Sequence, residues 1–196
     1  PKVFLDTSSL VAPDELNGDL LLMESRTSVR RITSHLLEQG RTLPGFIGDI
    51  GYAQSNRERY EGFCQALTDA GKKVDSSLCL TTPLGIDTYR EEIDTFLSSL
   101  SRMPDAFVCA SDYVACILMQ LLEKRGLRVP EDVAVSGFDN NTEDLLAEHL
   151  TTVQVFNEEL GARLALQILY RIKYPNTPHE VTYLGTNVLY RDSTGD

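Results

Sequence analysis

The stretch Pro104–Asn141, PDAFVCASDYVACILMQLLEKRGLRVPEDVAVSGFDNN, decides how this chain folds. Its pattern predicts a buried strand, a polar turn, an apolar helix, a second turn and a second buried strand. Polar residues follow each strand, Ser111-Asp112 after the first and Asp139-Asn140 after the second. Ligands of open α/β sheets bind beyond the carboxyl ends of the strands, so both pairs are predicted to face a ligand.

Helical and strand patterns alternate over nearly the whole chain. Apolar stripes at helical spacing predict helices at Ser28–Gln39, Ser55–Ala70, Thr88–Leu100, Tyr113–Arg125 and Glu158–Ile172. Short apolar runs predict strands at Lys2–Asp6, Leu43–Asp49, Val74–Leu80, Ala106–Ala110, Val133–Gly137 and Thr151–Val155. Val181–Tyr190 is predicted to form a last strand or a pair of strands. Ser55 and Glu58 are spaced as a capping box, and Asn157 precedes the last helix as a cap. Strands alternating with helices predict parallel βαβ units and an α/β fold of doubly wound parallel sheets.

The charge and the cysteines argue against several classes of protein. Acidic residues outnumber basic ones 29 to 18, and the net charge of −11 repels phosphate backbones, so this chain is not expected to bind nucleic acid by itself. The four cysteines lie in apolar stretches without a C-x-x-C pair, which predicts buried, reduced thiols and a cytoplasmic protein. No signal peptide and no apolar run near the ~20 residues of a membrane helix are present, so no membrane partner is expected.

Catalytic and metal-binding patterns do not emerge from the sequence. His35, His149 and His179 lie far apart and lack the carboxylate spacing of a metal site. No G-x-S-x-G, Walker loop or G-x-G-x-x-G is present. We therefore expect no catalytic residue, no metal, no cofactor and no enzymatic activity.

Several short patterns, taken together and in order, resemble one protein family. They are VFLDTSS, HLLEQG followed by LPGFIGD, SNRERYEGFCQAL with its R-x-x-G spacing, PDAFVCASDYVA, EKRGLRVPEDVAVSGFDN, LTTV and NVLYRDST. Their order and spacing are similar to those in the effector-binding core of the LacI/GalR family of bacterial transcription repressors. The resemblance covers essentially the whole chain and implies a type I periplasmic-binding-protein-like fold.

The resemblance implies two lobes that share the chain unequally. Residues 25–155 and 183–194 correspond to a nearly complete C-terminal lobe, and residues 1–23 and 157–182 to a partial N-terminal lobe. In the family, further βα units and a helix-turn-helix headpiece precede the VFLD-type strand. A chain that begins at Pro1 without Met is expected to be an N-terminally truncated piece of such a protein.

The same resemblance assigns five candidate ligand contacts: Asp6, Arg59, Ser111, Asp139 and Asn157. The carboxylates can accept from adjacent ligand hydroxyls, and the Arg59 guanidinium can hold ligand oxygens with its fork of donors. Each has a plainer structural interpretation, such as a turn or helix cap for the carboxylates and for Asn157.

Ser111 and Asp112, in the first polar turn, are expected to differ in role: one caps a helix and the other faces the ligand. The family often has Asn-Asp where this chain has Ser111-Asp112. We expect Asp112 to cap the following helix, which leaves Ser111 to face the cleft.

The leading functional hypothesis is a ligand-sensing regulatory domain. A small-molecule effector, a sugar or sugar derivative, would bind between the lobes, and a homodimer would pair two headpieces on operator DNA. One alternative is a solute-binding protein of a sugar transporter, which shares the fold. A remote alternative is a metal-dependent PIN-type nuclease, because VFLDTSSL resembles the opening strand of those enzymes. That alternative needs several more carboxylates near Asp6 to hold a divalent metal.

Overall fold

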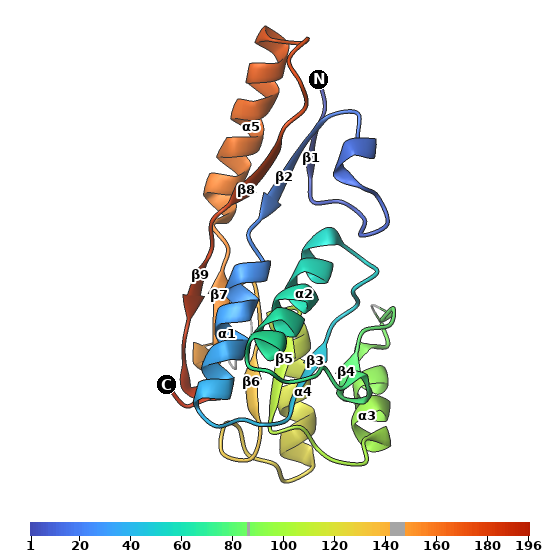
Figure 1. The fold of residues 1–196 in the computed structure, drawn as a ribbon, viewed down its shortest axis with the longest axis vertical. Helices are drawn as coiled ribbons and strands as arrows, with labels where there is room; N and C mark the ends of the chain where they lie inside the picture. Colours follow the sequence, from blue (N-terminus) through green and yellow to red (C-terminus); the bar gives the residue numbers. More distant parts are fainter. Residues whose placement is uncertain (86, 142–147) are drawn as a thin grey trace.

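Two parallel sheets form the framework of the computed structural model, which describes residues 1–85, 87–141 and 148–196 (Figure 1). The smaller sheet has the order β1-β2-β8, with β1 Val3–Leu5, β2 Asp19–Met23 and β8 Val181–Leu184. The larger sheet has the order β4-β3-β5-β6, with β3 Pro44–Ile47, β4 Cys79–Leu80, β5 Ala106–Cys109 and β6 Ala134–Ser136. An antiparallel pair, β7 Thr152–Gln154 and β9 Asn187–Leu189, extends the larger unit.

Helices cover both faces of the larger sheet. They are α1 Arg26–Glu38, α2 Gln54–Asp69, α3 Tyr89–Ser99 and α4 Asp112–Lys124, with α5 Asn157–Lys173 on the smaller unit. Phe46 of β3 and Val108 of β5 pack in one apolar cluster with α1 and α2. Their strand neighbours Ile47 and Phe107 pack in a second cluster with α3 and α4. Because successive strand residues point to opposite faces, these runs of buried residues produce the doubly wound arrangement that the sequence predicts.

The smaller sheet is held to α5 by a buried ion pair. The carboxylate of Asp19, which is 2% exposed, accepts hydrogen bonds from the guanidinium of Arg171 and from Gln167 Nε2. Burial alone would raise the pKa of Asp19, but hydrogen bonds from Arg171, Gln167 and the Glu180 N–H outweigh it and lower the pKa to about 2. Figure 1 shows α5 lying along β8 and β2.

The chain returns from the smaller to the larger unit later than expected. Tyr183 and Leu184 pair with Leu22 and Met23 of β2, so the expected lobe boundary before residue 183 falls inside β8. The return follows Leu184, where the Thr186 hydroxyl lies 2.8 Å from the Ser28 hydroxyl at the start of α1. The backbone pairing of β8 continues to Leu184 because the sheet partner β2 also extends to Met23.

The predictions for Ser55–Glu58 and for Val74–Leu80 are wrong. Ser55 and Glu58 form no capping box, because α2 begins at Gln54 and Ser55 lies inside its first turn. The strand expected over Val74–Leu80 is confined to Cys79–Leu80, and a 3₁₀ turn at Ser76–Leu78 precedes it.

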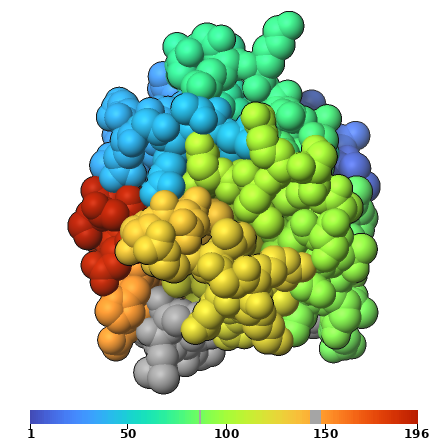
Figure 2. All heavy atoms as spheres, turned by 90° about the horizontal axis from the view of Figure 1, so that it is seen from below, coloured from blue at the N-terminus to red at the C-terminus, as the bar shows by residue number. Residues whose placement is uncertain are grey.

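The C-terminal residues lie against α1, where His35 Nε2 is 2.9 Å from Asp196 Oδ1. Figure 2 shows this end of the molecule, with the C-terminal segment in red beside the blue of α1.

Candidate functional site

Asp6 joins the two units across the space between their sheets. It follows the carboxyl end of β1 with a φ of 58°, and its Oδ2 accepts a hydrogen bond from the Ser55 hydroxyl at 2.5 Å. Its Oδ1 accepts from the Ser55 N–H at 3.3 Å, in the first turn of α2. The Gln54 N–H donates to the Thr7 carbonyl at 2.8 Å beside it. Asp6 thus caps a helix of the larger unit from the smaller one.

Arg59 lies one turn further along α2 and is 5% exposed. Its Nη1 donates to the Ala110 carbonyl at the end of β5, and its guanidinium carbon lies 3.7 Å from the centre of the Phe138 ring. Its Nη2 reaches Met23 Sδ of the smaller unit at 3.6 Å and Asp139 Oδ1 at 3.5 Å. Burial lowers the pKa of Arg59 below its usual value, while the nearby carboxylates oppose the change.

Asp139 presents a carboxylate at the carboxyl end of β6. Its side chain is 43% exposed and pairs with the buried guanidinium of Arg59. Burial raises the pKa of Asp139, and the Arg59 charge opposes the rise. A carboxylate that is paired on one side and open on the other can still accept hydrogen bonds from a ligand.

The helix-capping role expected for Asp112 is filled by Ser111 in the structure. Ser111 is the N-cap of α4, and its hydroxyl accepts from the Val114 N–H at 3.3 Å. Asp112 is the first helical residue, 2% exposed, and its carboxylate accepts from the Thr152 hydroxyl at 2.6 Å and the Asn141 N–H at 2.7 Å. The helix cap is thus Ser111, because Asp112 turns towards β7 instead. Burial raises the pKa of Asp112 to about 6, although these hydrogen bonds oppose the rise.

Asn157 does not cap α5. It is the first residue of that helix, Phe156 occupies the N-cap position, and no side-chain cap hydrogen bond is formed. The Asn157 side chain is exposed at the chain crossing between the two units. Its contact with a ligand therefore stays a prediction.

The structure brings Asp6, Arg59 and Asp139 together through α2. Asp6 meets the first turn of this helix, and Arg59 extends from the next turn to Asp139. Sequence reasoning missed Ser55 as the partner of Asp6, because its spacing to Glu58 suggested a local cap. It also missed Met23, which sits over Arg59 from the end of β2.

A second contact between the units involves Glu58, which is 3% exposed. Its Oε1 accepts from the Tyr183 hydroxyl of β8 at 2.7 Å and from Gln54 Nε2 at 3.2 Å. Burial raises the pKa of Tyr183 to about 12, and the hydrogen bond to Glu58 adds to the rise. No signal in the sequence links these two residues, which lie 125 positions apart.

The chemistry of this cluster fits binding. It offers carboxylate acceptors and a guanidinium donor, and the buried Arg59 Nε has no hydrogen-bond partner within the described part of the chain. No group of three or more potential ligand residues that could hold a metal ion occurs among residues 1–85, 87–141 and 148–196. Within the same residues, every helix is too short or too polar to span a bilayer.

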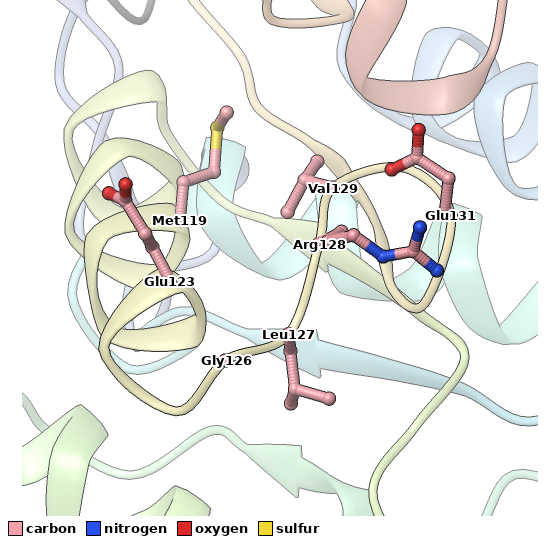
Figure 3. A pocket seen from close by; sticks show the side chains of 7 residues that line it. All are labelled: Met119, Glu123, Gly126, Leu127, Arg128, Val129 and Glu131. Carbon is pink, nitrogen blue, oxygen red and sulfur yellow. The ribbon is translucent and has the colours of Figure 1, made fainter.

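A separate groove lies at the other end of α4, roughly 20 Å from its first residue at a rise of 1.5 Å per residue. It has a volume of about 560 Å³, and Figure 3 shows Met119 and Glu123 lining it from α4 and five residues, Gly126–Val129 and Glu131, from the loop that follows. Arg128 in this loop is paired with Asp132 through its Nε at 3.0 Å. The groove shares no residue with the Asp6–Arg59–Asp139 cluster.

Comparison with known proteins identifies the family. A family model described as a periplasmic binding protein-like domain matches residues 33–194. The chain belongs to this family. Among its relatives are the HTH-type transcriptional regulator DegA of Bacillus subtilis, 32% identical over 146 residues, and the HTH-type transcriptional repressor PurR of Pasteurella multocida, 26% identical over 182 residues. The first match covers 74% of this chain and 42% of DegA, and the second 92% of this chain and 54% of PurR.

Solved structures place this periplasmic binding protein-like domain among LacI-family regulators. A putative LacI-family regulator from Sanguibacter keddieii has a TM-score of 0.83 at 26% identity, with 99% of this chain and 72% of that chain covered. A complex of the transcriptional regulator CelR with cellobiose has a TM-score of 0.86 at 27% identity, with 98% and 58% covered. The resemblance to the LacI-family effector-binding core is thereby confirmed, and the chain spans about half the length of the curated relatives it matches.

These relatives also bear on the alternatives. They are transcriptional regulators, which favours neither a transporter's solute-binding protein nor a nuclease. The carboxylate on which the nuclease hypothesis depended, that of Asp6, is engaged with Ser55 at the start of α2.

Proposed function

We propose that this chain is the effector-sensing part of a LacI-family transcriptional repressor, and that a sugar or sugar derivative binds between its two units. The observation that carries the proposal is the buried guanidinium of Arg59. Its Nη2 touches Met23 of one unit and Asp139 of the other, and its Nε has no hydrogen-bond partner among the residues that the structure describes. A charge held at such a boundary can bind ligand oxygens and respond to movement of the units. CelR, the structural neighbour solved with cellobiose, supports a carbohydrate as the ligand.

The five ligand contacts proposed are Asp6, Arg59, Ser111, Asp139 and Asn157. Asp6 and Asp139 are acceptors at strand ends in different units, so a polyol bound by both would favour one arrangement of the units over another. Ser111 keeps a hydroxyl proton to donate while its oxygen caps α4.

In the whole protein, ligand binding would control operator DNA through a headpiece that precedes this chain. A homodimer would supply the two-fold symmetry that paired half-sites require. The acidic charge of −11 fits a domain that leaves DNA contacts to another part of the protein, and the cytoplasm is the compartment where such a repressor acts.

A thermal-shift screen of sugars and nucleobases on this chain and on the full-length protein tests the proposal, with cellobiose as the first probe. A ligand at 100 times its Kd stabilises the folded state by about 2.7 kcal/mol, which raises Tm by several degrees in a chain of this size. Titration calorimetry of Asp139→Asn and Arg59→Met should then show at least a tenfold loss of affinity, since a charge-assisted hydrogen bond contributes about 1.5–3 kcal/mol.

The exposed pair at the far end of α4 supplies the control. Asp132→Asn removes a carboxylate that pairs with Arg128 outside the cluster, and it should leave the affinity unchanged. Equal affinities in the parent, Asp139→Asn and Arg59→Met would contradict the proposed site.

A further inference from the structure

Two consecutive residues after β6 have backbone conformations that residues other than glycine rarely adopt. The φ angle is 108° at Asp139 and 51° at Asn140. Asn tolerates the left-handed region, but a φ of 108° lies outside the region that Asp commonly visits. Such conformations persist only where the surrounding structure over-determines them, and they cluster at ligand-binding sites. The turn therefore needs contacts from other elements to keep its shape.

The backbone of the turn is tied to β7 and to the start of α4. The Asn140 N–H donates to the Thr152 hydroxyl at 3.2 Å, and the Asn141 N–H donates to Asp112 Oδ2 at 2.7 Å. The Thr152 hydroxyl in turn donates to Asp112 Oδ1 at 2.6 Å, so one buried pair receives both N–H groups. Because Asp112 and Thr152 are 2% and 0% exposed, water does not compete for these bonds.

The C-terminal segment holds the same turn from another side. Arg191 Nη2 donates to Asn140 Oδ1 at 2.8 Å, and its Nη1 donates to the Leu150 carbonyl at 3.0 Å. The Arg191 N–H donates to the Thr151 hydroxyl at 2.7 Å, which fixes the backbone from which this side chain extends. The side-chain Nδ2 of Asn140 also donates to Gln154 Oε1. These contacts bind the residue after Asp139 and leave the Asp139 carboxylate itself open.

The Asp139 carboxylate, by contrast, is held loosely. It is 43% exposed and lies 3.5 Å from Arg59 Nη2, longer than a good hydrogen bond. We propose that the Thr152–Asp112 pair and Arg191 are positioning residues, which hold the backbone turn so that Asp139 points towards Arg59 and the effector. This inference rests on the proposed function for its purpose, and on the geometry of the turn for its mechanism.

Amide hydrogen exchange measured by NMR tests the mechanism without any ligand. In Thr152→Val and Arg191→Met, exchange of the amides at residues 139–141 is expected to accelerate at least tenfold, while amides of β5 keep their rates. Thr33→Val is the matched control, because its buried hydroxyl bonds the Val29 carbonyl within α1. Arg125→Met is the matched control for Arg191→Met, because it removes a guanidinium that pairs with Asp94 in another part of the fold. Neither control should change exchange at residues 139–141. Unchanged exchange at residues 139–141 in both test variants would overturn the inference.

Rescue and binding separate positioning from general damage. Thr152→Ser keeps the hydroxyl and should restore slow exchange at residues 139–141. If Thr152→Val acted only by disturbing the packing, Thr152→Ser would not restore slow exchange, because serine also lacks the methyl group of threonine. With cellobiose as probe, Thr152→Val should weaken binding about tenfold, Thr152→Ser should regain it, and Thr33→Val should not change it. Unchanged binding in Asp139→Asn would defeat the proposed function, whereas the exchange rates still decide the positioning role.

Discussion

Replacing Arg171 by Met should destabilise the chain more than any surface substitution. Arg171 is 4% exposed and Asp19 is 2% exposed, so Arg171→Met leaves a carboxylate buried with only neutral donors. Removing one partner of a buried ion pair costs about 3–5 kcal/mol, because the remaining charge cannot return to water. With an m-value of about 2 kcal/mol/M, the midpoint of urea unfolding should fall by roughly 1.5–2.5 M.

The exposed pair Arg128–Asp132 is the matched control for this experiment. Its side chains are 70% and 35% exposed and lie four residues apart on the surface, so Arg128→Met should leave the midpoint of urea unfolding nearly unchanged. The double variant Asp19→Asn with Arg171→Met should be more stable than Arg171→Met alone, because no buried charge remains. If Arg171→Met costs no more than Arg128→Met, the buried pair does not hold α5 to the smaller sheet.

The pH dependence provides an independent check of the same pair. The pKa of Asp19 in the folded chain, about 2, lies below its usual value of 3.8. The pair therefore contributes stability that is fully present above pH 3.8 and is lost as the pH falls through about 2. The difference corresponds to about 2 kcal/mol. The gap in unfolding free energy between the parent and Arg171→Met should shrink by about this amount between pH 4 and pH 2, and a constant gap would contradict the assigned cause.

Three further outcomes are expected. Gly137→Ala should lower the unfolding free energy by about 1–3 kcal/mol in urea titrations, because the new methyl carbon would lie 2.2 Å from Asp112 Oδ1. Tyr183→Phe should cost about 1–3 kcal/mol, since it removes a donor from the buried Glu58 carboxylate, and a neutral result would show that solvent replaces the hydroxyl. Cys79 should react slowly with a disulfide reagent at pH 8, because burial raises its pKa to about 12, and rapid labelling of the folded chain would contradict this environment.

The positions of the helices and of most strands could be predicted from the sequence because each depends on local periodicity, but β2 at Asp19–Met23 was not predicted. The helix expected at Tyr113–Arg125 is found at Asp112–Lys124, and the strand expected at Ala106–Ala110 is found at Ala106–Cys109. The strand expected at Val74–Leu80 is mostly lost, because its partner β3 pairs with it only at Cys79 and Leu80.

The candidate site was less accessible to sequence reasoning than the fold. The resemblance selected Arg59 and Asp139, and the structure brings them within 3.5 Å, but their contact with an effector stays a prediction. The assignments that failed were short-range ones. Ser111 and Asp112 are neighbours that can each cap the same helix, so the choice between them depends on Thr152, which is 40 positions away from Asp112.

The sequence by itself determined the class of fold and the strand ends at which polar residues gather. Short continuous apolar runs specify the strands that are buried on both faces, and apolar residues at a period of about 3.6 specify the helices. Only the tertiary structure decided which partner each polar residue takes: Ser55 meets Asp6 instead of Glu58, and Glu58 meets Tyr183. A side chain with several donors or acceptors within reach bonds whichever group packing brings nearest, and that group often lies in a distant part of the chain.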